Sequence, residues 1–286
     1  MIQSFKCFRN RLNGEHQRMK QNVGKVEKKN RSIYYIQATC TSNSGKVREH
    51  NEDNFCFQKH IMPMEHQSLE EPYEFETELE DYVCMALFDG MGGESAGEMA
   101  SYVAASKFLE MEDEIIPTGI NLNELCTNLN SFVCNAGIVG RYHQIGTTAS
   151  IIIFETSRIW ICNLGDSPIY RYRAGELEML SQMHTNREAL ERMGITNRKP
   201  GLTQFLGISE SDFRVEPYIT VKDLKENDIF LMCSDGLTDM VPEDKIAEVL
   251  GREWDVHKKQ KRLLDMALEA GGGDNITIIL VRIGEN

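Results

Sequence analysis

Long apolar runs are missing from this sequence. No stretch approaches the roughly 18–20 residues that an α-helix needs to cross a bilayer. The opening residues, MIQSFKCFRNRLNG, also lack the apolar segment of a secretory signal. We therefore expect a cytoplasmic protein without a transmembrane segment.

Cysteines spaced as metal-binding or redox pairs are missing as well. The eight Cys residues include no CxxC pair, and most of them stand among apolar neighbours. This pattern is typical of reduced, buried thiols. It argues against both a disulfide framework and a zinc site.

Positive charge is scarce over most of the chain. The 286 residues carry a formal net charge of −13, which argues against a nucleic-acid-binding protein, because such proteins present basic surfaces. Residues 1–31 are the exception, with nine Lys/Arg against two Glu. We interpret them as a basic, flexible N-terminal arm, with a docking or membrane-surface role as the alternative. Residues 32–286 are then expected to form a single catalytic domain.

Apolar periodicity predicts strands in consecutive runs and helices in separate blocks. Helices are expected at 97–112, 121–137 (closed by Gly137), 242–251 and 259–272. Strands are expected at 32–42, 51–60, 81–89, 149–155, 159–167, 168–175, 228–236 and 275–283. The first two strands alternate like a neighbouring pair, and residues 61–81 are interpreted as a polar excursion. Such an order favours an α+β fold with antiparallel sheets and helices packed outside them.

Against these absences, the sequence contains four acidic fragments in which Asp stands beside Gly or Asn where a strand ends. They are GKVREHNEDNF (45–55), ALFDGMGGESAGE (86–98), CSDGLTD (233–239) and GGGDNITIILV (271–281). Like charges brought together destabilise each other, and a hard cation with oxygen ligands offsets that repulsion. The carboxylates concerned are Glu52, Asp53, Asp89, Asp235 and Asp274. The sequence therefore indicates an enzyme that depends on Mg²⁺ or Mn²⁺.

The fragments also match a known family in their order. The series R-x-x-N-E-D, D-G-M-G-G-x-x-x-G-E, G-T-T, G-D-S, C-S-D-G-L-T-D and G-x-x-D-N-I-T spans about residues 34–283. It resembles the metal-dependent serine/threonine phosphatases of the protein phosphatase 2C family, bacterial type. The resemblance implies a sandwich of two antiparallel sheets flanked by helix pairs. It also implies phosphoprotein substrates and an opposing serine/threonine kinase, and we expect a monomer that binds no nucleic acid.

The resemblance implies a centre of two Mn²⁺ or Mg²⁺ ions. Asp89 matches the carboxylate that bridges the ions, and Gly90 matches the residue whose carbonyl oxygen binds one of them. The other matching positions are Asp235 and Asp274 as direct ligands, and Glu52 and Asp53 as ligands that act largely through waters. Two ions about 3.5–4 Å apart lower the pKa of a bridging water, so that hydroxide attacks phosphoserine or phosphothreonine.

Arg48 matches the arginine that binds the phosphate. A guanidinium fork pairs with two phosphate oxygens, which suits this role. The segment 186–202 falls where the family carries a flap that faces the substrate. Its basic residues Arg187, Arg192, Arg198 and Lys199 could contact a phosphopeptide, and a mobile surface helix is an equal alternative.

A third ion is doubtful. Asp239 matches one ligand of the weaker third site, but Met183 stands where the family commonly carries a second carboxylate. A thioether is a poor ligand for Mg²⁺ or Mn²⁺. We therefore expect weak binding of a third ion.

Several polar residues nearby have simpler interpretations. Asp166 of G-D-S is expected at a hairpin between apolar strands, as a turn residue rather than a ligand. Thr147 and Thr148 are expected to fix the start of a strand. His50 is interpreted as a solvated loop residue, which leaves the general acid unassigned.

Two other function classes stay open. A pseudophosphatase would keep the fold without turnover, although the presence of all five carboxylates, Gly90 and Arg48 argues against it. A different two-metal phosphoesterase would act on small phosphates or nucleotides. The acidic balance argues against this class, as does the absence of a Lys-Ser/Thr pair after the glycines at positions 92, 93 and 97.

Overall fold

The structure is a computed structural model that describes residues 34–91, 96–115, 121–142, 145–209 and 214–285. Ile33–Asn286 form one compact unit, which is the subject of the following description. The basic arm predicted for residues 1–31 lies outside the described residues. Among those that are described, no helix combines the length and apolar character needed to cross a membrane.

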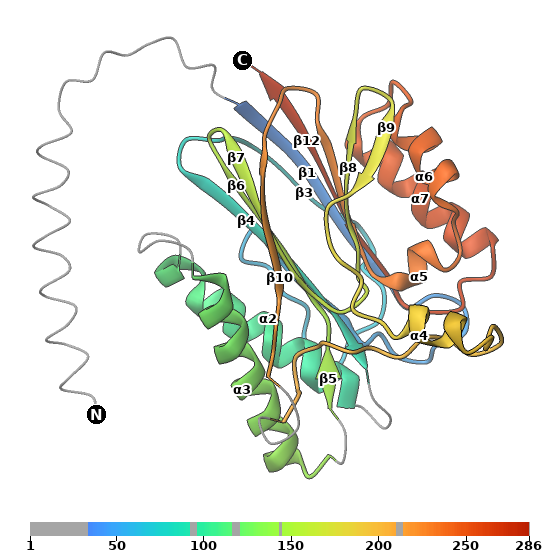
Figure 1. The fold of residues 1–286 in the computed structure, drawn as a ribbon. Coiled ribbons are helices and arrows are strands. Elements are labelled where there is room, and N and C mark those ends of the chain that lie inside the picture. The colour runs from blue at the N-terminus through green and yellow to red at the C-terminus, as the bar shows by residue number, and fades with distance from the viewer. Residues whose placement is uncertain (1–33, 92–95, 116–120, 143–144, 210–213, 286) are drawn as a thin grey trace, which may run out of the picture. The chain divides into compact units, whose positions relative to one another are not determined.

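Two antiparallel sheets form the centre of this unit (Figure 1). The strands of the first sheet are, in spatial order, β3 (Tyr73–Glu78), β1 (Tyr34–Asn43), β12 (Ile276–Glu285), β11 (Ile229–Cys233), β8 (Ile169–Arg173) and β9 (Glu176–Met179). Those of the second are β10 (Tyr218–Asp223), β7 (Arg158–Leu164), β6 (Ala149–Glu155), β4 (Tyr82–Met91) and β2 (Asp53–Phe57), with β5 (Gly146–Thr147) beside β4. The predicted α+β class with two antiparallel sheets is confirmed.

Helix pairs cover the outer faces of the sheets (Figure 1). The second sheet is covered by α2 (Ala96–Ile115) and α3 (Leu122–Gly140), and the first by α6 (Glu243–Leu250) and α7 (Val256–Glu269). One apolar core fills the space between the sheets, and a further core lies under each helix pair. Two short helices, α4 (Arg187–Arg192) and α5 (Asp235–Thr238), lie in loops instead.

Helix α3 extends beyond its predicted end at Gly137. Its N-cap is Asn121, whose side chain accepts a hydrogen bond from the backbone N–H of Glu124, and its C-cap is Arg141 in the left-handed conformation. Gly137 lies inside the helix because Ile145 packs against it. A Cβ at this glycine would stand 2.5 Å from the Cγ2 of Ile145.

The strand pairing differs from the sequence prediction at two places. β1 and β2 do not pair with each other: β1 lies between β12 and β3, and β2 pairs with β4 in the other sheet. G-D-S is not a hairpin, because β7 and β8 also belong to different sheets. In addition, the segment interpreted as a polar excursion contains edge strand β3, and β10 was not predicted. Both of these are edge strands with only partly buried side chains, so their apolar pattern is weak.

The cysteines agree with the prediction of buried thiols. The cysteines that the structure describes are free, and all except the partly buried Cys134 are buried.

Candidate metal centre

Asp89 lies near the end of β4, directly opposite Asp53 of β2. Its backbone N–H donates to the Oγ1 of Thr148 at 3.0 Å, and its carbonyl oxygen accepts from the N–H of Thr148 at 2.8 Å and the Oγ1 of Thr147 at 2.9 Å. Both backbone groups of Asp89 are therefore held by the G-T-T threonines. This contact explains the polar residues at the end of β5 (Thr147) and directly before β6 (Thr148).

Asp53 connects the two sheets. Its side chain is 1% exposed, and its Oδ2 accepts hydrogen bonds from the hydroxyls of Ser234 and Thr277, both at 2.7 Å. Ser234 directly follows β11 and Thr277 belongs to β12, so both donors come from the first sheet. This arrangement brings the Asp235 and Asp274 loops to the end of the second sheet where Asp53 and Asp89 lie.

Glycines allow three backbone segments to touch beside these carboxylates. The N–H of Gly90 donates to the carbonyl oxygen of Glu52 at 3.1 Å, and a Cβ on Gly90 would stand only 2.4 Å from that oxygen. A Cβ on Gly97 would stand 2.6 Å from Oε1 of Glu52. A side chain at either position would separate Glu52 from β4 and from the start of α2.

Asn275 holds the loop that carries Arg48 and Glu52. Its Oδ1 accepts from the N–H of Glu52 at 2.8 Å, and its Nδ2 donates to the carbonyl oxygens of Ser44 at 3.1 Å and His50 at 2.9 Å. The sequence analysis assigned no function to Asn275 and missed this one. The Asp-Asn order of the fragment was the available clue.

The carboxylates are close enough to perturb one another. Burial raises the pKa of Asp53 to about 7, with the carboxylates of Asp235 and Asp274 adding to the shift and the two hydroxyls opposing it. Burial likewise raises the pKa of Glu52 to about 7, against the effect of Arg48. The pKa of Asp89 lies well above its usual range, first through burial and then through Asp53 and its other acidic neighbours. The fold thus brings the five predicted carboxylates to one place.

The donor set fits hard divalent cations. It consists of carboxylate oxygens and the Gly90 carbonyl, which are the ligands that Mg²⁺ and Mn²⁺ prefer. In the described part of the chain, no group of three or more His, Cys, Asp or Glu side chains is arranged to hold an ion by itself. Mg²⁺ usually keeps several waters and takes only one or two carboxylates, so two such ions are compatible with this arrangement.

Two basic side chains contact the acidic group, the name used below for the carboxylates of Glu52, Asp53, Asp89, Asp235 and Asp274. Arg48 lies at its rim, 48% exposed, with Nη2 2.9 Å from Oδ2 of Asp274. Lys199, the last basic residue of the predicted flap, places its Nζ 2.7 Å from Oδ2 of Asp235. The other flap cations, Arg187, Arg192 and Arg198, are exposed.

Asp166 does not lie at a hairpin as predicted, and it interacts electrostatically with this group. Burial and the nearby Asp235 raise its pKa to about 6, while Lys199 opposes the shift. Asp166 also raises the pKa of Asp89. Asp166 therefore lies close enough to these carboxylates to influence them, and the G-D-S link crosses from one sheet to the other at this position. His50 is a solvated residue as predicted, with its side chain 66% exposed, and its Nδ1 lies 3.4 Å from Oε1 of the buried Glu98.

Comparison with known proteins agrees with this geometry. Residues 47–276 match the family model described as protein phosphatase 2C. The chain belongs to the protein phosphatase 2C family.

Relatives within the family are named as serine/threonine phosphatases. The chain is 30% identical over 209 residues to PstP of Mycobacterium tuberculosis, a match that covers 70% of this chain and 40% of PstP. It is 29% identical over 262 residues to the phosphatase stp of Listeria monocytogenes, covering 86% and 95% of the two chains. The solved catalytic domain of PstP in complex with two manganese ions superposes with a TM-score of 0.64 at 26% identity, covering 88% of this chain and 99% of that one.

The structure also describes the residues on which the prediction of a weak third ion depends. Met183 is 36% exposed, so its side chain does not belong to the core. Asp166 and Asp239 both interact electrostatically with Asp235. Asp166, Asp235 and Asp239 are thus close enough to influence one another, while the side chain of Met183 offers no carboxylate.

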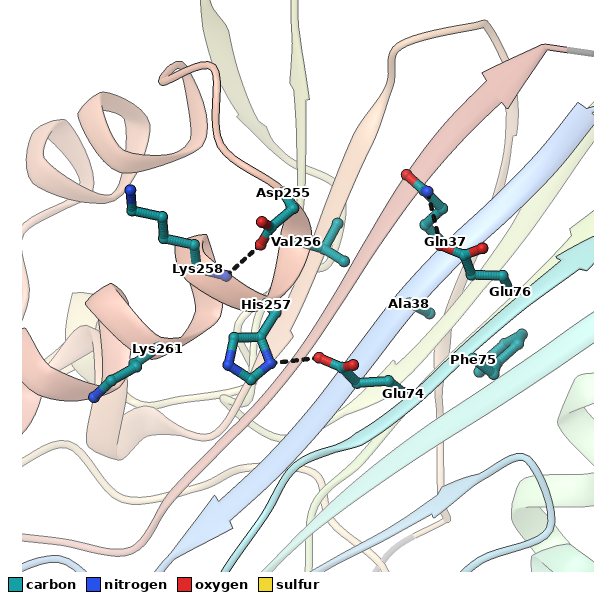
Figure 2. Close-up of a pocket in the computed structure, with 10 residues that line it drawn as sticks. All are labelled: Gln37, Ala38, Glu74, Phe75, Glu76, Asp255, Val256, His257, Lys258 and Lys261. Carbon is teal, nitrogen blue, oxygen red and sulfur yellow. Dashed lines mark hydrogen bonds and ion pairs between the residues drawn. The ribbon is translucent and has the colours of Figure 1, made fainter.

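A separate hollow is lined by none of the carboxylates of the candidate metal centre (Figure 2). It is bordered by the beginning of α7 and by strands β1 and β3. Figure 2 shows His257 of α7 pointing toward Glu74 of β3, with which it forms an ion pair. None of the residues that line this hollow belongs to the predicted site.

Proposed function

We propose that this protein hydrolyses phosphoserine and phosphothreonine in proteins, with two Mn²⁺ or Mg²⁺ ions held by the acidic group. The observation that carries the proposal is the convergence of carboxylates from both sheets around the buried Asp53. Family membership and the two manganese ions of PstP support it. The match to PstP spans only 40% of that protein, so its activity is carried over as part of this proposal.

Each residue of the group has a distinct task in this proposal. Asp89 would lie between the two ions, and the carbonyl of Gly90 would bind one of them. Asp235 and Asp274 would bind directly, and Glu52 and Asp53 largely through waters. When bound, the ions lower the pKa of a water molecule and so supply the nucleophile at neutral pH.

Arg48 would orient the phosphate group. Its guanidinium has five N–H donors, and one nitrogen is used by Asp274. The others remain available for two phosphate oxygens, which fixes the phosphorus relative to the ligands. The ion pair with Asp274 thus holds Arg48 at the rim of the site before substrate binds.

The experiment that tests this function compares phosphopeptides with small phosphomonoesters, with and without Mn²⁺. We expect Mn²⁺-dependent release of phosphate from phosphoserine and phosphothreonine peptides. Asp89→Asn should remove at least about 90% of that activity, which corresponds to about 1.4 kcal/mol of barrier. Circular dichroism should show that the variant is folded.

Three results would contradict the proposal. Phosphopeptide binding without turnover would indicate a pseudophosphatase. Turnover of small phosphomonoesters alone would indicate another phosphoesterase. Full activity of Asp89→Asn would show that Asp89 is not the carboxylate that bridges the two ions. An opposing kinase, a monomeric state and a cytoplasmic location stay predictions.

A further inference from the structure

Lys199 contacts two carboxylates, that of Asp235 in the acidic group and that of the neighbouring Asp239. Its Nζ lies 2.7 Å from Oδ2 of Asp235 and 3.1 Å from Oδ2 of Asp239. Asp235 is the first residue of α5 and Asp239 follows the same short helix, so both carboxylates come from one turn of the chain. The ammonium thus bridges two carboxylates of which one, Asp235, is a proposed ligand of the metal centre.

The position of Lys199 is set by the narrow base of its loop. Residues 185 and 202 pair as an isolated β-bridge. The N–H of Asn186 donates to the carbonyl oxygen of Gly201 at 3.0 Å, and the N–H of Gly201 donates to Oδ1 of Asn186 at 2.9 Å. Lys199 lies only two residues from this base. The backbone near Lys199 is therefore held in place, so that its side chain extends toward Asp235 from a fixed position. The backbone at the tip of a long loop is not held in this way.

Lys199 is also the electrostatic link between this loop and the body of the domain. Within residues 187–200, all of which the structure describes, it alone forms an ion pair outside the loop. The ion pair of Arg192 stays inside α4, with Glu188. Removal of the Lys199 ammonium would leave residues 187–200 without an ion pair to the rest of the domain.

The ammonium offsets repulsion among three carboxylates. Burial lowers the pKa of Lys199, but Asp235 and Asp239 outweigh this effect and the pKa lies above its ordinary value. Lys199 in turn opposes the rise in the pKa of Asp166 and of Asp235. A divalent cation at the same carboxylates would have the same effect, because it too compensates their charge.

We propose that the Lys199 ammonium is a built-in cation that competes with a third divalent ion for Asp235 and Asp239, and that it holds residues 186–202 at the metal centre. The proposal rests on the proposed function only in treating Asp235 as a metal ligand. It makes Lys199 a positioning residue rather than a substrate contact. A divalent ion that takes Asp239 displaces Lys199 and releases the loop.

The test uses Lys199→Ala and Lys199→Arg, with Lys245→Ala as the matched control. Lys245 pairs with Glu248 on the exposed face of α6 at 3.1 Å, so its removal deletes an ammonium–carboxylate pair far along the chain from the loop. Calorimetric titration with Mn²⁺ measures the number and affinity of bound ions. Hydrogen–deuterium exchange of the metal-free protein measures how firmly residues 186–202 are held.

We expect Lys199→Ala to bind one ion beyond the two of the main centre more tightly than the natural protein does. The gain is about tenfold if the ammonium occupies the carboxylates for about nine-tenths of the time. Residues 186–202 should also exchange faster in this variant. Lys199→Arg, which keeps the cation, and Lys245→Ala should both behave like the natural protein.

The proposal is overturned if Lys199→Ala leaves either the affinity for the additional ion or the exchange of residues 186–202 unchanged. It is also overturned if Lys199→Ala loses the two ions of the main centre, because Lys199 would then support that centre. These readouts need no turnover. Failure of the natural protein to hydrolyse phosphopeptides with Mn²⁺ would refute the proposed function and would leave them unaffected.

Discussion

Asp53 should make the metal-free protein less stable as the pH rises from about 5 to 8. Its folded-state pKa is about 7, against 3.8 for an ordinary aspartate. Between these values the folded protein keeps a proton that the unfolded chain has lost. The folded state therefore binds more protons, and the free energy of unfolding falls with increasing pH. The loss is small below about pH 4 and complete above about pH 7.

The size of this loss of stability follows from the shift in the pKa of Asp53. About three pKa units correspond to about 4 kcal/mol, which is an upper value because the neighbouring carboxylates share the proton uptake. Asp53→Asn removes the charge and keeps an amide oxygen that can accept from Ser234 and Thr277. The metal-free variant should therefore match the natural protein near pH 4.5 and exceed it in stability at pH 8. Because Glu52 also has a pKa of about 7, the free energy of unfolding of the variant should still fall with increasing pH, but with a smaller slope.

Urea unfolding followed by circular dichroism, after exhaustive removal of metal, measures this dependence at several pH values. Added Mn²⁺ at pH 8 should stabilise the natural protein more than the variant, because bound ions compensate the buried carboxylate. The reasoning is refuted if the stability of the natural protein is constant or rises from pH 5 to 8. It is refuted equally if Asp53→Asn keeps the full slope.

Two further substitutions examine the rim and the backbone of the site. Arg48→Ala should lower kcat/KM about 10- to 100-fold, which corresponds to the loss of a charged hydrogen bond. Arg48→Lys should restore little of this activity. Loss of Mn²⁺ binding by Arg48→Ala in calorimetry would contradict the role of Arg48 as a phosphate-binding residue. Gly236→Ala should reduce the free energy of unfolding by about 1–3 kcal/mol, because its Cβ would lie 2.0 Å from the carbonyl oxygen of Asn275. Gly201→Ala, whose Cβ would meet nothing nearer than 4.0 Å, is the control in the same urea assay.

Much of the candidate site could be predicted because its residues carry a local pattern. Asp89, Asp235 and Asp274 each stand beside Gly or Asn at the end of an apolar strand or just before one, and this short pattern can be recognised without knowledge of the fold. The fold class could be predicted for a similar reason, since apolar periodicity shows which segments are strands. The identity of the acidic residues and the layered α+β architecture follow from these short-range features.

Partners across the molecule could not be predicted in this way. The link at Asp166 looked like a hairpin, because a short turn between two strands has the same local chemistry whether the strands share a sheet or not. The structure puts β7 and β8 in different sheets, and this crossing directs Asp166 toward Asp235. Lys199 had only a basic, polar neighbourhood in the sequence, with no mark of the carboxylates that it contacts.

The sequence by itself determined which residues of this protein can bind a hard cation, because side-chain chemistry and turn geometry are properties of a few adjacent residues. The tertiary structure alone decided that Asp53 is buried between hydroxyls of the opposite sheet, and that Lys199 reaches Asp235 across 36 positions of the chain. Burial and charge pairing depend on distances between remote segments. Those distances arise only when the two sheets pack around their shared core.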